Sequence, residues 1–218
     1  MSADYAILDE YSARHSILVQ TAEKLQLHLR ELVLGLPRID SVVARAKDPH
    51  RYFVKATKVD DTGKPKYADP RYEIQDQIGV RINVLYLFDV EIVRQHLMRF
   101  MRHIEEAPKS PINDEAFGYF GHHFIFQLPD DVVSDLHKKE TPQFFELQIK
   151  TLFQHAWSET HHDLGYKAKR DLTSDERRHI AFTAAQAWGA DKIFEDLAAP
   201  LVLNDNDTSP DALLRHPR

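Results

Sequence analysis

The sequence predicts an α+β domain with a long helix at each end. Two observations carry this prediction: apolar residues recur at helical spacing towards both ends of the 218-residue chain, and three short segments between them have the apolar and β-branched pattern of strands. A composition of 43% hydrophobic and 28% charged residues is ordinary for a globular protein and excludes a disordered or fibrous chain. We therefore expect one domain over residues 1–203, followed by a polar tail over 204–218.

The individual elements follow from periodicity and from the residues that interrupt it. The first helix is expected over residues 4–34, because the apolar pattern continues to Leu32 and Gly35 and Pro37 then end it. A core over about 38–168 follows; its first part is basic, and Thr62–Pro65 has the composition of a mobile loop. Strands are predicted over 78–88, 123–128 and 143–151, and further helices over about 90–104, 152–166 and 174–197.

Composition also narrows the class of protein. The chain has no cysteine, which excludes disulfides, thiolate nucleophiles and thiolate metal sites and fits a reducing, cytoplasmic location. No apolar run approaches the ~18 residues of a membrane span, and the first residues lack the pattern of a secretory signal, so no membrane is expected.

Charge is unevenly distributed along the chain. The formal net charge is −6, which predicts no general affinity for nucleic acid. Residues 28–71 nevertheless carry ten Lys or Arg against six Asp or Glu, a local excess of +4. Such a segment is typical either of a solvated surface or of a localised site for an anion such as phosphate.

Each predicted strand has one apolar face and one face with polar, ionisable groups near one end, because successive side chains of a strand point to opposite sides. The polar set comprises Arg81, Asn83, His123, Gln127, Glu146, Gln148 and Lys150. This pattern indicates either a half-solvated sheet or the polar floor of a concave site.

Two carboxylates could give that face a metal site. Asp76 precedes the first predicted strand and Glu146 lies in the third. Mg²⁺ prefers such hard oxygen ligands and keeps waters and substrate phosphates as its others; Mn²⁺ is the substitute we would expect to work. Carboxylates, a divalent ion and several Lys or Arg side chains suit phosphoryl-type transfer, and the absence of a GxxxxGK[ST] segment excludes a P-loop.

Four segments, in the same order, resemble the RelA/SpoT-type synthetase domain and its small alarmone synthetases. They are ARAKDPHRYFVKATK (44–58), DQIGVR (76–81), FGYFGHHFIF (117–126) and FELQIKTLFQHAWSETHHDLGYK (145–167). The resemblance implies a nucleotidyltransferase-like fold with a mixed sheet of about five strands flanked by helices. It also implies an ATP-dependent pyrophosphokinase that transfers pyrophosphate to the ribose 3′-hydroxyl of GDP or GTP.

On the ATP side, the resemblance implies that Arg45 and Arg81 clamp the adenine and that Lys47 and Lys55 grip the phosphates, with Arg51 beside them.

The resemblance further makes Asp76 a metal ligand and Glu146 either a second metal ligand or the base that deprotonates the acceptor hydroxyl. The residues implied for the acceptor pocket are Tyr119, as a stacking ring for guanine, with His123, Gln148, Lys150 and His155 around it.

Three departures from the family pattern leave the acceptor open. Gly121 replaces a serine beside the acceptor, Arg51 replaces a serine in the basic segment, and Lys150 replaces an arginine. A toxic relative that modifies the 3′ end of tRNA or an adenosine nucleotide is therefore one alternative, and a catalytically silent nucleotide-binding regulator is another. A homo-oligomer or an antitoxin partner is also compatible with the sequence.

One histidine cluster permits a different interpretation. His155, Glu159 and His162 share one face of the predicted helix and could ligate a transition metal. We favour instead a polar helix face that borders the active site.

Overall fold

The computed structural model describes residues 3–108, 118, 119, 121–167 and 170–203. Six α-helices and five strands lie in these ranges, with short 3₁₀ turns between them. The elements in chain order are α1 (Ala3–Leu32), β1 (Ile39–Ala46), α2 (Pro49–Ala56), α3 (Pro70–Glu73), η1 (Gln75–Gln77), β2 (Ile78–Val84), α4 (Leu87–Phe100), β3 (His103–Pro108), β4 (His122–Gln127), η2 (Asp130–Val132), η3 (Asp135–His137), β5 (Phe144–Thr151), α5 (Leu152–Lys167) and α6 (Ser174–Val202).

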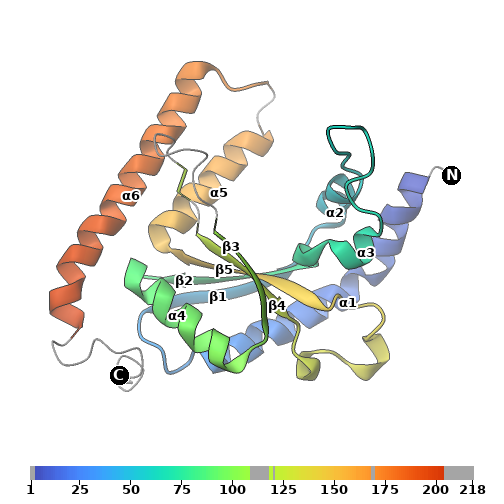
Figure 1. Ribbon diagram of the computed structural model, residues 1–218, viewed down its shortest axis with the longest axis horizontal. Coiled ribbons are helices and arrows are strands. Elements are labelled where there is room, and N and C mark those ends of the chain that lie inside the picture. Colours follow the sequence, from blue (N-terminus) through green and yellow to red (C-terminus); the bar gives the residue numbers. More distant parts are fainter. Residues whose placement is uncertain (1–2, 109–117, 120, 168–169, 204–218) are drawn as a thin grey trace.

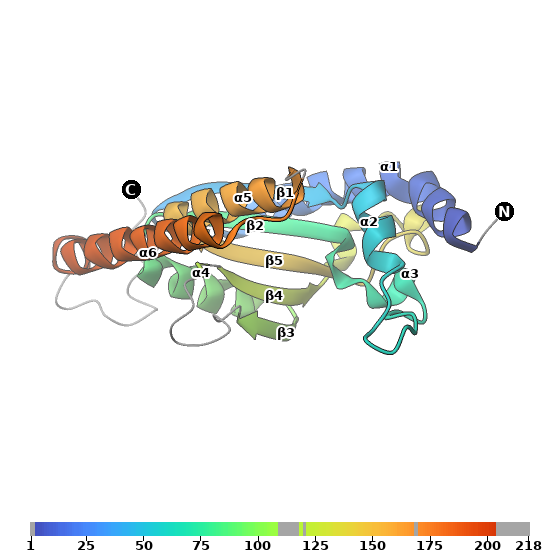
Figure 2. The ribbon, with the colours of Figure 1, turned by 90° about the horizontal axis from the view of Figure 1, so that it is seen from above.

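The strands form one sheet in the order β1-β2-β5-β4-β3, which Figure 2 shows from above. Strands β2 and β5 pair in parallel, with Gly79 opposite Glu146 and Arg81 opposite Gln148. The other three pairings are antiparallel. The predicted mixed sheet of five strands is therefore confirmed.

Helices α1 and α4 cover one face of the sheet, and α5 lies on the other (Figure 1). The predicted inward side chains of α1 are buried: Tyr11, Leu18, Leu25 and Leu29 are all 0% exposed. They meet the apolar faces of the strands, including the fully buried Leu147. Because α1 and α4 take up the apolar face, the polar face of the strands is left for the site. Among the described helices none is long and apolar enough to cross a membrane.

Two edge strands were not predicted from the sequence. In β1 the side chain of Val42 alone is fully buried, so the strand lacks a continuous apolar face and reads as part of the basic segment. At the other edge, β3 begins at His103, whereas the sequence predicts that the preceding helix continues to residue 104. Met101 adopts extended backbone (φ −125°, ψ 145°) and ends α4, so the prediction for residues 101–104 was wrong.

The turn around residues 60–64, expected to be a mobile loop, is organised by local hydrogen bonds. Asp60 Oδ1 accepts from the backbone of Thr62 and of Lys64, at 2.8 and 3.0 Å. Gly63 has φ +80°, a conformation that side-chain-bearing residues rarely adopt. The segment is thus a built turn between α2 and α3.

Candidate active site

A cleft of about 370 Å³ lies on the polar face of the sheet. Its walls come from β1, from the start of α2, from η1 and from the first halves of β2 and β5, and α5 borders it through an ion pair described below. Of the predicted site residues, the cleft lining includes Arg45, Lys47, Arg51, Asp76, Arg81, Glu146 and Gln148. Residues more than 100 positions apart in the sequence thus meet at one site.

Asp76 lies at one end of the cleft between two ammonium groups. Its Oδ2 accepts a hydrogen bond from Lys47 Nζ at 2.7 Å, and its Oδ1 lies 2.9 Å from Lys55 Nζ. The three side chains are 19%, 19% and 32% exposed, so the cluster is only partly in water. Two cations around one carboxylate leave a net positive charge, which favours an anionic ligand.

Local sequence explains how the two lysines reach Asp76. Lys47 directly follows β1, and its backbone N–H donates to the Gln77 carbonyl at 2.8 Å. Lys55 lies in the last turn of α2, which begins at Pro49 and is capped by Asp48, whose Oδ1 accepts from the Arg51 N–H at 3.0 Å. The Asp-Pro pair thus starts a helix in what the sequence suggested was only a basic segment.

Glu146 projects from β5 on the same face. Its Oε1 lies 2.9 Å from His123 Nδ1, and its Oε2 accepts from Gln148 Nε2 at 2.8 Å. The side chain of His123 is only 7% exposed. Both carboxylate oxygens are therefore oriented by neighbours on β4 and β5, as expected for a catalytic carboxylate.

Arg81 is paired with α5 across the cleft. Its guanidinium Nη1 donates to Glu159 Oε1 at 2.7 Å. Burial raises the pKa of Glu159, but the charges of Arg81, His155 and Arg45 outweigh it and lower the pKa overall. Glu159 is thus an arginine partner, which supports the polar-face interpretation of this helix. The sequence predicted Glu159 to lie on this polar helix face, with metal ligation as the alternative, but it did not identify Arg81 as its partner.

His155 and Lys150 lie beside this ion pair. Burial lowers the pKa of His155, and the charges of Arg81 and Lys150 lower it further, which favours the neutral imidazole at pH 7. Lys150 is 5% exposed and donates from Nζ to Ser158 Oγ on α5 at 3.0 Å. The polar face of the strands therefore continues under α5.

Tyr119 is not brought to the cleft. It is 8% exposed and packs with Trp157 and Ala184, between α5 and α6. Its hydroxyl donates to Asp191 Oδ2 at 2.6 Å, and Thr151 donates to the same oxygen at 2.5 Å. Its predicted role as a stacking ring stays a prediction that requires the ring to leave this cluster.

Close packing explains why a glycine occupies the nearby position 121. A Cβ at this position would lie 2.3 Å from Lys150 Cγ and 2.7 Å from the Ile149 carbonyl oxygen. The chain therefore passes too close to β5 for a serine, and the departure from the family pattern reflects this close approach rather than the loss of a hydroxyl alone. Phe120 and residues 109–117 lie outside the described residues.

The donor set of the cleft fits a divalent cation bound with a nucleotide. Asp76 and Glu146 supply hard oxygen ligands from one cleft. Mg²⁺ is commonly held by one or two carboxylates together with water and substrate phosphates. The ammonium groups of Lys47 and Lys55 contact the Asp76 oxygens that a metal ion would need. They would therefore have to move towards the phosphates when the metal binds.

Comparison with known proteins agrees with this site. A family profile described as "Region found in RelA / SpoT proteins" matches residues 44–171, which include almost every residue assigned to the cleft. A comparison with curated protein sequences gives no match.

Several solved structures share the fold. A GTP pyrophosphokinase family protein from Streptococcus pneumoniae superposes with a TM-score of 0.68 at 22% identity, over 100% of both chains. Small alarmone synthetase 1 from Bacillus subtilis bound to its product pppGpp gives 0.69 at 21% identity, over 84% of this chain and 95% of that one. The same enzyme bound to AMPCPP gives 0.63 at 20% identity, over 85% and 96%.

These likenesses establish the fold, and the profile match covers more than half of the chain. The chain belongs to the RelA/SpoT family.

Proposed function

We propose that this protein is an ATP-dependent pyrophosphokinase that makes guanosine 3′,5′-polyphosphates from GDP or GTP. The observation that carries the proposal is the single cleft in which two oriented carboxylates lie among five cationic side chains. The cations are Arg45, Lys47, Arg51, Lys55 and Arg81. Transfer between phosphates depends mostly on positioning and charge neutralisation, which such a set supplies.

ATP would lie along the β1 and α2 side of the cleft. Lys47 and Lys55 would exchange their contacts with Asp76 for contacts with the triphosphate, and Arg51 would add a third cation. Arg45 and Arg81 would hold the adenine between planar guanidinium groups. For Arg81 this requires release from Glu159, with which it forms a 2.7 Å ion pair.

Asp76 and Glu146 would hold a magnesium ion with the nucleotide. When bound, the ion neutralises charge on the phosphates and polarises the bond that breaks. The exchange of lysine contacts described above would free the oxygens of Asp76 in the same step that brings in the phosphates. We therefore expect metal and ATP to bind with positive cooperativity.

Glu146 would take the proton from the acceptor. The 3′-oxygen attacks the β-phosphorus of ATP, the bond between the α- and β-phosphates breaks, AMP leaves, and the hydroxyl proton passes to the carboxylate. His123 and Gln148 would keep that carboxylate aimed at the hydroxyl, because each already contacts one of its oxygens. Lys150, His123 and Gln148 would face the ribose and 5′-phosphates of the acceptor.

A label-transfer experiment tests the proposal. The protein is incubated with γ-labelled ATP and, separately, with GDP, GTP, ATP and deacylated tRNA. We expect the label on GDP or GTP. Label on tRNA or on an adenosine nucleotide would show that the acceptor is different while the reaction is still pyrophosphate transfer. If no acceptor is labelled and ATP stays intact, the result would favour a nucleotide-binding regulator.

A further inference from the structure

Arg14 is a charged residue within the apolar face of α1. It lies one turn after Tyr11 and one turn before Leu18, which are both 0% exposed, and is itself only 4% exposed. Burying a guanidinium is costly unless its donors are paired. An arginine at this position therefore needs partners, and none of them has been assigned a function above.

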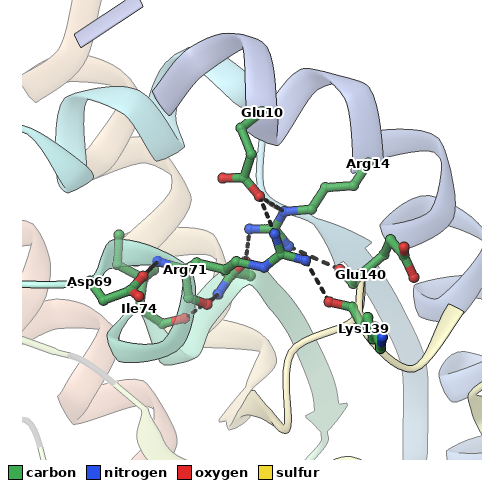
Figure 3. A network of polar contacts seen from close by, with 8 residues as sticks. Glu10, Arg14, Asp69, Arg71, Ile74, Lys139 and Glu140 are labelled. Atoms are coloured by element: carbon green, nitrogen blue, oxygen red, sulfur yellow. Dashed lines mark hydrogen bonds and ion pairs between the residues drawn. The ribbon is translucent and has the colours of Figure 1, made fainter. Parts of the chain in front are cut away.

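The partners of Arg14 come from α1 itself and from segments far away in the sequence, and Figure 3 shows the network that they form. Its Nη2 donates to Gln77 Oε1 at 2.7 Å, and its Nη1 donates to the Glu140 carbonyl at 3.1 Å. Glu10 Oε1 lies 3.2 Å from its Nε and also accepts from Arg71 on α3 at 2.8 Å. One helix is thus tied to α3, to η1 and to the loop before β5.

Gln77 is the link between Arg14 and the cleft. It is 0% exposed, and its Nε2 donates to the carbonyls of Arg71 and Ile74 at 2.7 and 2.9 Å. Every polar atom of its side chain is therefore paired. The preceding residue is Asp76, whose backbone has the non-helical values φ −95° and ψ 28°. The hydrogen bonds of Gln77 thus define the turn from which the Asp76 carboxylate projects.

Helix α1 also contacts Lys47, the ion-pair partner of Asp76. The Tyr11 hydroxyl donates to the Lys47 carbonyl at 2.9 Å, while the Lys47 N–H donates to the Gln77 carbonyl at 2.8 Å. The Tyr11 ring stacks on Tyr52 of α2 at 3.8 Å. Both residues of the Lys47–Asp76 ion pair are therefore attached to α1 through buried contacts.

We propose that Arg14 and Gln77 are positioning residues, which set the Asp76 carboxylate and thereby the affinity of the cleft for a divalent cation bound with a nucleotide. This inference rests on the proposed function in one respect, the assignment of Asp76 as a metal ligand. Neither residue lines the cleft, so both would act through Asp76. Side chains that orient a metal ligand typically change metal affinity 10- to 100-fold when they are replaced.

The test compares Arg14→Met with Arg38→Met as a matched control. Arg38 also forms a buried ion pair, donating to Asp89 at 2.7 to 3.0 Å, but it joins the start of β1 to α4 and has no contact with the cleft. Free Mn²⁺ is measured by electron paramagnetic resonance in titrations with a non-hydrolysable ATP analogue. We expect roughly 10-fold weaker Mn²⁺ binding in Arg14→Met, and wild-type binding in Arg38→Met despite a comparable loss of melting temperature.

Arg14→Lys is measured in parallel, because it keeps the charge but has one nitrogen in place of the two that donate to Gln77 and Glu140. Weakened Mn²⁺ binding in it would support the inference. Equal Mn²⁺ binding in the Arg14 variants and in Arg38→Met would overturn it.

If the wild-type protein itself binds no Mn²⁺, the proposed metal site is wrong. Amide hydrogen exchange over residues 76–79 then decides the positioning role on its own. Faster exchange in the Arg14 variants than in Arg38→Met would support it, and equal exchange would refute it.

Discussion

Replacement of Glu146 by Gln separates the chemistry from the architecture of the cleft. The side chain keeps its shape and loses its capacity to accept a proton. General-base catalysis contributes roughly 10²- to 10⁴-fold to a rate, which corresponds to about 2.7 to 5.4 kcal/mol of the activation barrier. We expect Glu146→Gln to lose turnover by at least this much when both substrates are saturating.

The structure indicates that the variant will fold. The carboxylate contacts Gln148 Nε2, which donates, and His123 Nδ1, which accepts or donates according to its tautomer. A glutamine can point its oxygen at Gln148 and its NH2 group at His123, so both of these contacts can be kept. Both hydrogen bonds change from charge-assisted to neutral, which costs about 1 kcal/mol for each, or ~4–8 °C in melting temperature in total for a chain of this size.

The assay measures initial rates of label transfer together with binding of a non-hydrolysable ATP analogue. ATP binding is expected to stay within a few-fold of wild type, because the residues proposed to contact the adenine and the phosphates lie on β1, α2 and β2, whereas Glu146 lies on β5. Glu146→Asp is the control that retains a carboxylate. Turnover near the wild-type rate in a folded Glu146→Gln protein would remove Glu146 from the mechanism.

Three further predictions concern the metal, the acceptor and the buried carboxyl of Asp191 on α6. Activity should require Mg²⁺ or Mn²⁺ and should not respond to zinc, because the cleft offers carboxylate oxygens; full activity in EDTA would contradict this. Lys150→Ala should raise the KM for the acceptor more than the KM for ATP. The control Ser158→Ala, which removes only the hydroxyl that lies 3.0 Å from Lys150 Nζ, should change both KM values little. Equal shifts of the two KM values in Lys150→Ala would place Lys150 outside the acceptor pocket. Burial raises the pKa of Asp191 above its ordinary value of 3.8, although hydrogen bonds from Thr151 and Tyr119 act in the opposite direction. The stabilisation that Asp191 gives the folded protein is therefore full at low pH and is lost as the pH rises through the folded-state pKa. Relative to Asp191→Asn, the wild-type melting temperature should therefore be highest near pH 4 and should fall towards pH 7, and a constant difference would refute the assignment.

The elements that the sequence predicts well are those with one fully buried face. Helix α1 and strands β2, β4 and β5 carry apolar residues at regular spacing, so their bounds agree with the structure to within a few residues. The two strands that were missed, β1 and β3, are the edges of the sheet. An edge strand pairs on one side only, and its alternation is weak because many of its side chains face water.

The cleft was predictable in its residue types but not in its contacts. Alternation along β5 correctly separates Glu146 and Gln148 from the buried Leu147. Sequence alone could not show that Lys47 and Lys55 meet on Asp76, since that depends on α2, whose start is signalled only by Asp48-Pro49. The sequence does indicate that Arg14 is unusual, because it is the single charged residue between Tyr11 and Leu18 on an apolar helix face. Its partner Gln77 could not be predicted, because it lies 63 residues away in the chain.

The identity of the nucleotide released from ATP tests the central claim most directly. Transfer of pyrophosphate releases AMP, whereas an ordinary kinase or a hydrolase that removes one phosphate releases ADP. We predict one AMP formed for each GDP or GTP converted, no ADP, and loss of both products in Glu146→Gln. Formation of ADP, or of AMP at the same rate in Glu146→Gln and wild type, would contradict the assignment of this cleft as a site of pyrophosphate transfer.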